Sequence, residues 1–102
     1  MSKHLLFLMF ISVFSLVFLN PALSQEDLNR HLEAANAAYE NQQYNVAIEK
    51  FKKGYSKIKG RKYDLKGKVS FRMGECYRLN GDYRRSRVYY YRAIRFDYAT
   101  IN

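Results

Sequence analysis

The chain has 102 residues, 48% of them hydrophobic and one of them proline, and its formal net charge is +9. This length leaves room for one small domain at most. The single cysteine, Cys76, excludes an intramolecular disulfide, and the absence of a glycine-rich loop excludes the usual phosphate-binding motifs.

Residues 1–24 have the layout of a secretory signal peptide. Lys3 precedes an apolar run of fifteen residues, 5–19, and small residues then stand three and one positions before a cut ahead of Gln25. A retained membrane anchor is the alternative, but fifteen residues fall short of the roughly 18 to 20 that span the hydrocarbon core. We therefore expect an exported protein whose mature chain is residues 25–102, with no retained transmembrane helix.

The mature segment predicts helices and requires no strand. Its apolar periodicity places helices near 27–41, 44–59, 63–79 and 83–97. Residues 41–43 and 80–82 are the expected turns within each pair, and residues 60–62 link the pairs. The sequence therefore predicts an all-α fold of two helical hairpins.

The second hairpin shows the pattern most clearly. One helical face carries residues at intervals of three and four, namely Ser70, Met73, Gly74 and Tyr77. The next helix repeats the period with Tyr83, Ser86, Tyr90, Ala93 and Ile94. Between them, Gly81 can end one helix in the left-handed conformation and Asp82 is a good N-cap for the next. At Gly74 the missing side chain predicts a close approach of the two helices.

The same pattern occurs 39 residues earlier, so the chain contains an internal repeat. The copies cover residues about 28–61 and 67–100. Copies of roughly 34 residues with this small-and-aromatic helix-turn-helix signature resemble the tetratricopeptide repeat, which implies a short α-solenoid. The residues that match the family pattern, and that we predict to pack the repeats, are Ala35, Tyr44, Ala47, Phe51, Gly74, Tyr77, Gly81, Tyr83, Tyr90 and Ala93.

Several positions depart from the family pattern. In the first copy Gln42 replaces the turn glycine, Ala38 the expected tyrosine and Gly54 the late alanine. In the second copy Ser86 stands at the usual alanine and Tyr98 at the closing proline. These departures concern the details of packing rather than the repeat itself.

The resemblance also implies a binding surface, because the first helix of each family hairpin lines a concave groove that holds an extended peptide or a helix. The groove positions it implies in this chain are Asn36, Tyr39, Glu40, Lys68, Arg72, Glu75 and Arg78, with Asn29, Leu32 and Phe71 beside them. Some family members grip a carboxylate there with lysine, arginine and asparagine. Asn36, Lys68 and Arg72 resemble part of that clamp, whereas Leu32 stands where a lysine is expected. The alternative for each polar residue is an ordinary exposed side chain.

Two hairpins are fewer than the about three repeats and polar cap that an independent array usually needs. A face of the second hairpin that includes Tyr89, Tyr90 or Ile94 would therefore lie uncovered, and such a face seeks a partner. Two explanations stay open at this point. Either the chain leads a longer protein, or it associates with itself or with another protein.

Basic residues are concentrated in the middle of the chain. Between Lys50 and Arg72 there are ten lysines and arginines and one acid, Asp64, and removing the leader takes away only Lys3, which leaves +8. A basic surface interleaved with tyrosines could bind an anionic polymer such as peptidoglycan, a lipid surface or nucleic acid. The alternative is a solvated face, and the expected export argues against nucleic acid.

No pattern in the sequence predicts catalysis. Cys76 and His31 lie in different copies and lack a third orienting group, so they do not predict a nucleophile and base. Metal-ligand spacing is also absent. We predict no catalytic residue, cofactor or metal, and expect Cys76 to be a buried small hydrophobe.

The order of these features resembles one particular setting. A signal peptide is followed at once by H-L-E-A-A-N-x-x-Y and later by E-C-Y-R-L-N-G-D-Y. This arrangement is similar to the amino-terminal repeat segment of Bacteroidetes envelope proteins of the outer-membrane protein A family, some of which serve type IX secretion or gliding motility. The resemblance implies a non-enzymatic scaffold that binds a protein or peptide partner in the periplasm or at the outer membrane.

Overall fold

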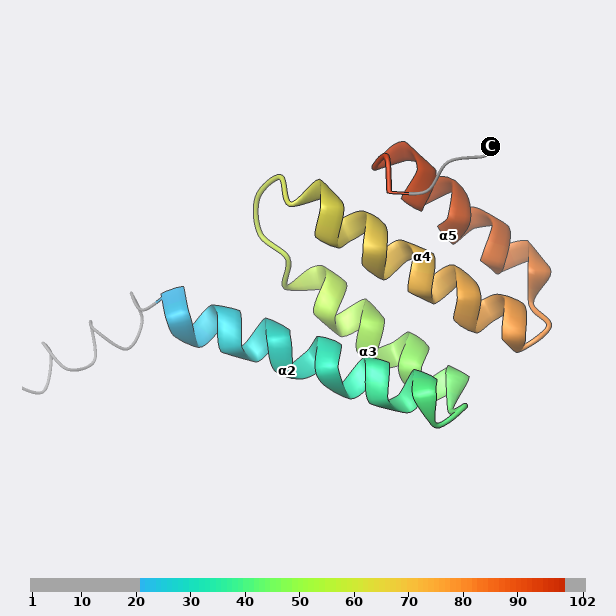
Figure 1. Cartoon of the computed structure of the whole chain (residues 1–102), viewed down its shortest axis with the longest axis horizontal. Helices are drawn as coiled ribbons and strands as arrows, with labels where there is room; N and C mark the ends of the chain where they lie inside the picture. The colour runs from blue at the N-terminus through green and yellow to red at the C-terminus, as the bar shows by residue number, and fades with distance from the viewer. Residues whose placement is uncertain (1–20, 99–102) are drawn as a thin grey trace, which may run out of the picture.

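The computed structural model describes residues 21–98, which form four helices and no strand: α2 (Pro21–Glu40), α3 (Tyr44–Ser56), α4 (Tyr63–Leu79) and α5 (Tyr83–Arg95). Helices α2 and α3 form one antiparallel hairpin, α4 and α5 form the other, and α3 packs on α4 (Figure 1). This confirms the predicted all-α fold of two hairpins in a short solenoid-like stack. The predicted signal peptide lies mostly outside the described residues.

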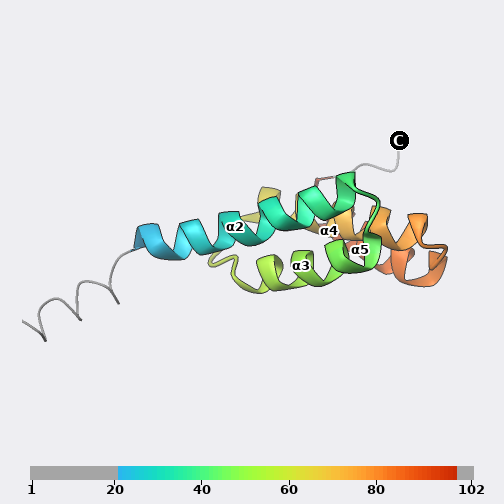
Figure 2. The same cartoon turned by 90° about the horizontal axis from the view of Figure 1, so that it is seen from below.

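Successive helices alternate between two layers. Figure 2 shows α2 above α3 and α4 above α5, so that α2 and α4 form one layer and α3 and α5 the other. In the part of the chain that the structure describes, no helix combines the length and the hydropathy needed to cross a membrane.

The helix ends differ from the predicted ones by a few residues. Helix α2 begins at Pro21 rather than near residue 27. Proline suits the first turn of a helix because its fixed φ is helical and its missing N–H has no partner there. Helix α5 stops at Arg95 because Asp97 takes a left-handed φ of 58° and the Tyr98 N–H bonds to the Ala93 carbonyl at 3.1 Å.

The internal repeat is visible in the backbone. Helices α3 and α5 are both 13 residues long and start 39 residues apart. Their preceding turns close with equivalent hydrogen bonds, Gln43 N–H to the Ala38 carbonyl and Asp82 N–H to the Tyr77 carbonyl, both at 2.8 Å. The two hairpins are therefore built on one local plan.

The turn residues of the two copies occupy the same conformation with different side chains. Gly81 has φ 81°, and Gln42, 39 residues earlier, has φ 61°. Glycine adopts this left-handed conformation freely, whereas a residue with a Cβ is strained in it. The missing turn glycine of the first copy is thus a local cost and not a different turn.

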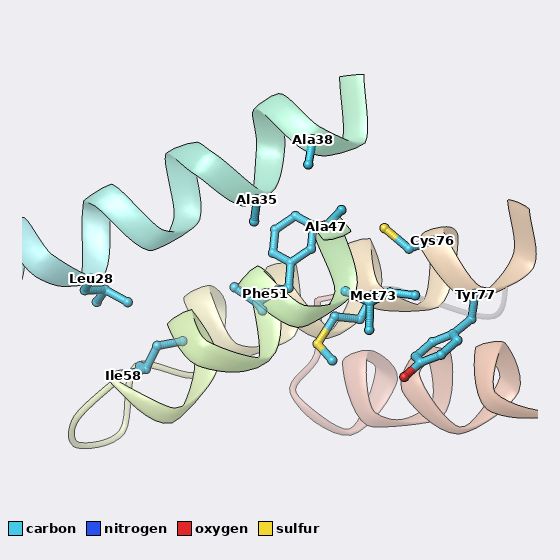
Figure 3. Packing of buried hydrophobic residues seen from close by; sticks show 11 residues of the cluster. Leu28, Ala35, Ala38, Ala47, Phe51, Ile58, Met73, Cys76 and Tyr77 are labelled. Carbon is cyan, nitrogen blue, oxygen red and sulfur yellow. The ribbon is translucent and has the colours of Figure 1, made fainter. Parts of the chain in front are cut away.

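The core lies between α2, α3 and α4. Phe51 is 1% exposed and points into the space between Ala35 of α2 and Met73 of α4, as Figure 3 shows. Alanine and cysteine on the facing helices leave room for this ring. Cys76 is fully buried, which confirms its expected place in the core, and burial raises the pKa of its thiol to about 11.

Close contact between α4 and α5 depends on Gly74. A Cβ added there would lie 2.9 Å from Cδ1 of the Tyr90 ring, which is nearer than such contacts allow. The ring also lies 5.6 Å from that of Phe71. Tyr90 thus fills the space that a side chain at position 74 would occupy.

The residues after α5 fold back over the start of α4. Phe96 stacks on Tyr63 with ring centroids 5.8 Å apart, and Tyr98 lies 5.8 Å from Phe71. The backbone of Gly67 lies directly beneath both side chains. Tyr98, which stands where the family pattern has proline, therefore contributes to packing.

Candidate functional site

Three of the implied groove residues meet between α2 and α4. Asn36 of α2 and Lys68 and Arg72 of α4 line a hollow of about 50 Å³, together with Leu32, Leu65, Val69 and Phe51. We call this site the α2/α4 hollow. Its rim is polar and basic and its floor is apolar. The fold therefore joins residues from both copies of the repeat into one surface feature.

Arg72 is held at the edge of this hollow by an aromatic ring. Its guanidinium carbon lies 4.8 Å from the centroid of the Tyr39 ring. Tyr39 is supported in turn by an edge-on contact with Tyr44 at 6.0 Å. A cation over a tyrosine contributes about 0.5–1 kcal/mol at an exposed site, so Arg72 is ordered before any ligand arrives.

Two other implied groove residues belong to a different cluster. Arg78 pairs with the Glu75 carboxylate at 2.7 Å and donates from Nε to the Tyr90 hydroxyl at 3.2 Å, and that hydroxyl donates to Glu75. Burial opposes ionisation of Glu75, but the hydrogen bonds from Arg78 and Tyr90 outweigh it and hold the pKa of this carboxyl below its ordinary value. The structure thus engages Glu75 and Arg78 with α5, away from the α2/α4 hollow.

The chemistry of the α2/α4 hollow is that of a small anchoring site. Lys68 and Arg72 offer charged donors and Asn36 an amide, which together suit a carboxylate or a backbone carbonyl. At about 50 Å³ the hollow is far smaller than the roughly 300–1,000 Å³ of small-molecule pockets. It has room for one side chain of a larger ligand. Within residues 21–98 no three His, Cys, Asp or Glu side chains lie close enough together to hold a metal ion.

Most of the residues predicted to pack the repeats lie in the interior, but one does not. Those that are fully or nearly buried are Ala35, Ala47, Phe51, Gly74, Tyr77 and Ala93, while Tyr44 and Tyr90 are half-buried and Gly81 lies in the exposed turn. Tyr83 is 66% exposed, so the packing role predicted for it is wrong. As the first residue of α5, directly after the Asp82 cap, it turns outward to solvent.

A set of contacts between arginines and tyrosines is absent from the sequence-based predictions. Arg92 lies 4.8 Å from the ring centroid of Tyr89 and 5.7 Å from that of Tyr55 on α3. Tyr89 stacks on Tyr77 of α4 at 5.3 Å, so it does not lie on the uncovered face as expected. Tyr91, 56% exposed, takes that place. The alternation of arginine and tyrosine along α5 is the only sequence signal for these contacts.

Comparison of the chain with protein-family models, with curated proteins and with solved structures finds no match. Function is therefore inferred from the residues and from the geometry just described. These give an all-α protein of two stacked helical hairpins, with one small polar hollow between the first helices of the pairs.

Proposed function

We propose that the chain is an exported, non-enzymatic interaction module of the tetratricopeptide type, which binds a protein partner at the α2/α4 hollow. One observation carries the proposal. Asn36 and Arg72, 36 residues apart, meet with Lys68 around an apolar floor. This is an arrangement suited to holding one anchoring side chain of an extended peptide or a helix.

The physical argument rests on order and on charge. Arg72 is stacked on Tyr39 and so loses little conformational freedom when it bonds to a ligand. Lys68 is exposed beside it, which places two positive charges at the mouth of the hollow. A partner segment that presents an acidic or carbonyl oxygen next to an apolar side chain would fit both parts.

The proposed site of action is outside the cytoplasm. Residues 1–24 have the pattern of a cleaved leader, and the order of leader and repeats is similar to envelope proteins of the secretion and motility machinery. We place the protein in the periplasm or at the outer membrane. Intact-mass analysis of protein from fractionated cells tests this: a chain that begins at Gln25 supports export, and a full 102-residue chain in the cytoplasm contradicts it.

Site-specific photo-cross-linking tests the binding site. A photoreactive residue placed at Asn36 or at Lys68 should cross-link one defined protein in cells, and Arg72→Glu should abolish that product. Val46 on α3 and Val88 on α5 serve as matched controls, because they are 41% and 51% exposed in the other layer. Equal yields from all four positions, or none from Asn36 and Lys68, would reject the assignment.

A second candidate function is favoured by the charge of α5. This helix has five arginines and no acid, and Arg92 is ordered between two tyrosine rings. Such a surface could bind an anionic polymer such as peptidoglycan. Co-sedimentation with purified peptidoglycan should then weaken as salt rises and should fall in Arg92→Gln. Retention that is insensitive to both changes would exclude this function.

A further inference from the structure

Helix α5 carries an outer face that no described segment covers. We call it the α5 face; its residues are Tyr83, Arg84, Arg87, Tyr91 and Ile94. Tyr83 and Tyr91 are 66% and 56% exposed, and a hollow of about 290 Å³ lies among these side chains and Arg78. Large exposed aromatic surfaces of this kind are uncommon on monomers and mark interaction sites.

Helix α2, at the other end of the stack, carries a face of opposite character (Figure 1). We call it the α2 outer face; its residues are Glu26, Arg30, Glu33, Ala34 and Ala37, and all of them except the half-buried Ala34 are exposed. The whole of α2 has four acids and one arginine, whereas α5 has five arginines and no acid. One end of the stack is therefore small and acidic, and the other is bulky and basic.

The contact between the two hairpins shows how such faces fit together. At the junction of α3 and α4, Ile48 of α3 is 6% exposed, and Met73 and Cys76 of α4 are 2% and 0% exposed. A shift of 39 residues, the repeat length, carries Ile48 onto Arg87 and Cys76 onto Ala37. The α5 face and the α2 outer face are thus the free equivalents of the two sides of this junction.

We propose that the α5 face of one copy of this chain packs on the α2 outer face of the next copy and repeats the α3–α4 junction between molecules. The internal contacts translate into complementary pairs. Arg72 over Tyr39 becomes Glu33 of the next copy beside Arg78, which is an ion pair. This association is independent of what the α2/α4 hollow binds.

Shape and charge support the same arrangement. The bulky Tyr83 and Tyr91 of one copy face the small Ala34 and Ala37 of the next, so the helices can approach closely. Arg78 is 47% exposed and keeps donors available beyond its bond to Glu75. Because the two faces differ, the contact is heterologous and produces open chains or rings rather than closed pairs.

The test uses the full chain, purified as its host processes it, and sedimentation over a wide range of concentration at low salt. The weight-average mass should rise past twice the monomer mass with increasing concentration and fall again when salt is added. Ala37→Arg blocks the α2 outer face and Arg87→Glu blocks the α5 face, and each variant alone should remain monomeric. Val46→Arg and Lys53→Glu are matched controls at exposed positions of α3, and they should assemble like the parent.

Mixing the two blocked variants gives the decisive result. The Ala37→Arg chain keeps its α5 face and the Arg87→Glu chain keeps its α2 outer face, so an equimolar mixture should reach at least twice the monomer mass. An association that Arg87→Glu abolishes but Ala37→Arg leaves intact would show a symmetric contact between α5 faces and would overturn the proposal. A parent chain that stays monomeric at every concentration would overturn it as well.

Discussion

Gly74 and Tyr90 determine, as a pair, how close the helices of the second hairpin come. The ring of Tyr90 occupies the space left by the missing side chain, with Cδ1 2.9 Å from where a Cβ would lie. The equivalent pair in the first hairpin is Ala35 and Phe51. A larger ring is thus accommodated in each copy by a small residue on the facing helix.

Replacement of Gly74 by leucine should therefore destabilise the protein by roughly 1 to 3 kcal/mol or more, because the added atoms displace Tyr90. Urea denaturation followed by circular dichroism measures the change, with Lys53→Leu as a control at an exposed helical site. In a Tyr90→Ala background the same substitution should cost less. Equal costs in both backgrounds would mean that Tyr90 is not the obstacle.

The carboxylate of Glu75 should make the stability of the fold depend on pH. Its pKa in the folded protein lies below the ordinary value of 4.5, so its contribution is present above that value and is lost as the pH falls through the folded pKa. Glu75→Gln should therefore be less stable than the parent at neutral pH, and the difference should shrink in acid. Thermal unfolding of both proteins across the acid range measures this, and a constant difference would refute it.

At the scale of the elements, the two hairpin turns differ in quality although their backbones agree. Gln42 has the left-handed conformation that Gly81 adopts without strain. Asp82 accepts a hydrogen bond from the Arg85 N–H at 3.2 Å, whereas Gln43 at the start of α3 makes no side-chain cap. The second hairpin thus has the better turn and the better cap.

Replacement of Gln42 by glycine should stabilise the protein, because it removes a strain of about 1 kcal/mol that exceeds the added entropy of the unfolded chain. The midpoint of chemical denaturation should rise. Asn41→Gly, one position earlier and outside the left-handed conformation, is the matched control and should destabilise. A loss of stability in Gln42→Gly would show that the glutamine side chain makes a contribution larger than its strain.

The elements that the sequence predicts best are those with a strong period. The three-and-four spacing of Ser70, Met73 and Tyr77 identifies α4, and all three residues are buried. Which of three consecutive tyrosines in α5 faces α4 is not predictable in this way, because together they span more than half of the helix circumference. For this reason the sequence does not reveal that Tyr89 packs on α4 while Tyr91 faces outward.

The candidate site was predictable only in part, again for a physical reason. Asn36, Lys68 and Arg72 meet as the repeat pattern implies, since the pattern specifies how first helices pack side by side. The engagement of Glu75 and Arg78 with Tyr90 depends on the short distance between α4 and α5, which no spacing in the sequence reports.

At the scale of the whole molecule, the core joins both hairpins into one unit. Phe51 of α3 packs in the same cluster as Ala35 of α2 and Met73 of α4. A protein of this size has a total stability of only about 5–15 kcal/mol, so the loss of one central ring is a large fraction of it. The hairpins are expected to unfold together.

Phe51→Ala should therefore destabilise both hairpins, by about 3–5 kcal/mol, because it leaves a cavity where α2, α3 and α4 meet. Hydrogen exchange measures the effect in each helix, with Val46→Ala, at a position 41% exposed, as the control. Amides of α4 and α5 should lose protection together with those of α2 and α3. Continued protection of α4 and α5 would show that the second hairpin is an independent unit.

The unequal turns have a consequence for the order of folding. A local turn that needs no strain and carries its own cap lowers the barrier to hairpin formation, so the α4–α5 hairpin is expected to form early and to serve as the surface on which α3 and α2 dock. A ribosome, however, delivers the chain from its N-terminus, and the hairpin with the strained Gln42 turn emerges first. The first half of the chain therefore waits in a loosely structured state until the second half is released, which is a state that a transport machinery requiring an unfolded chain can accept.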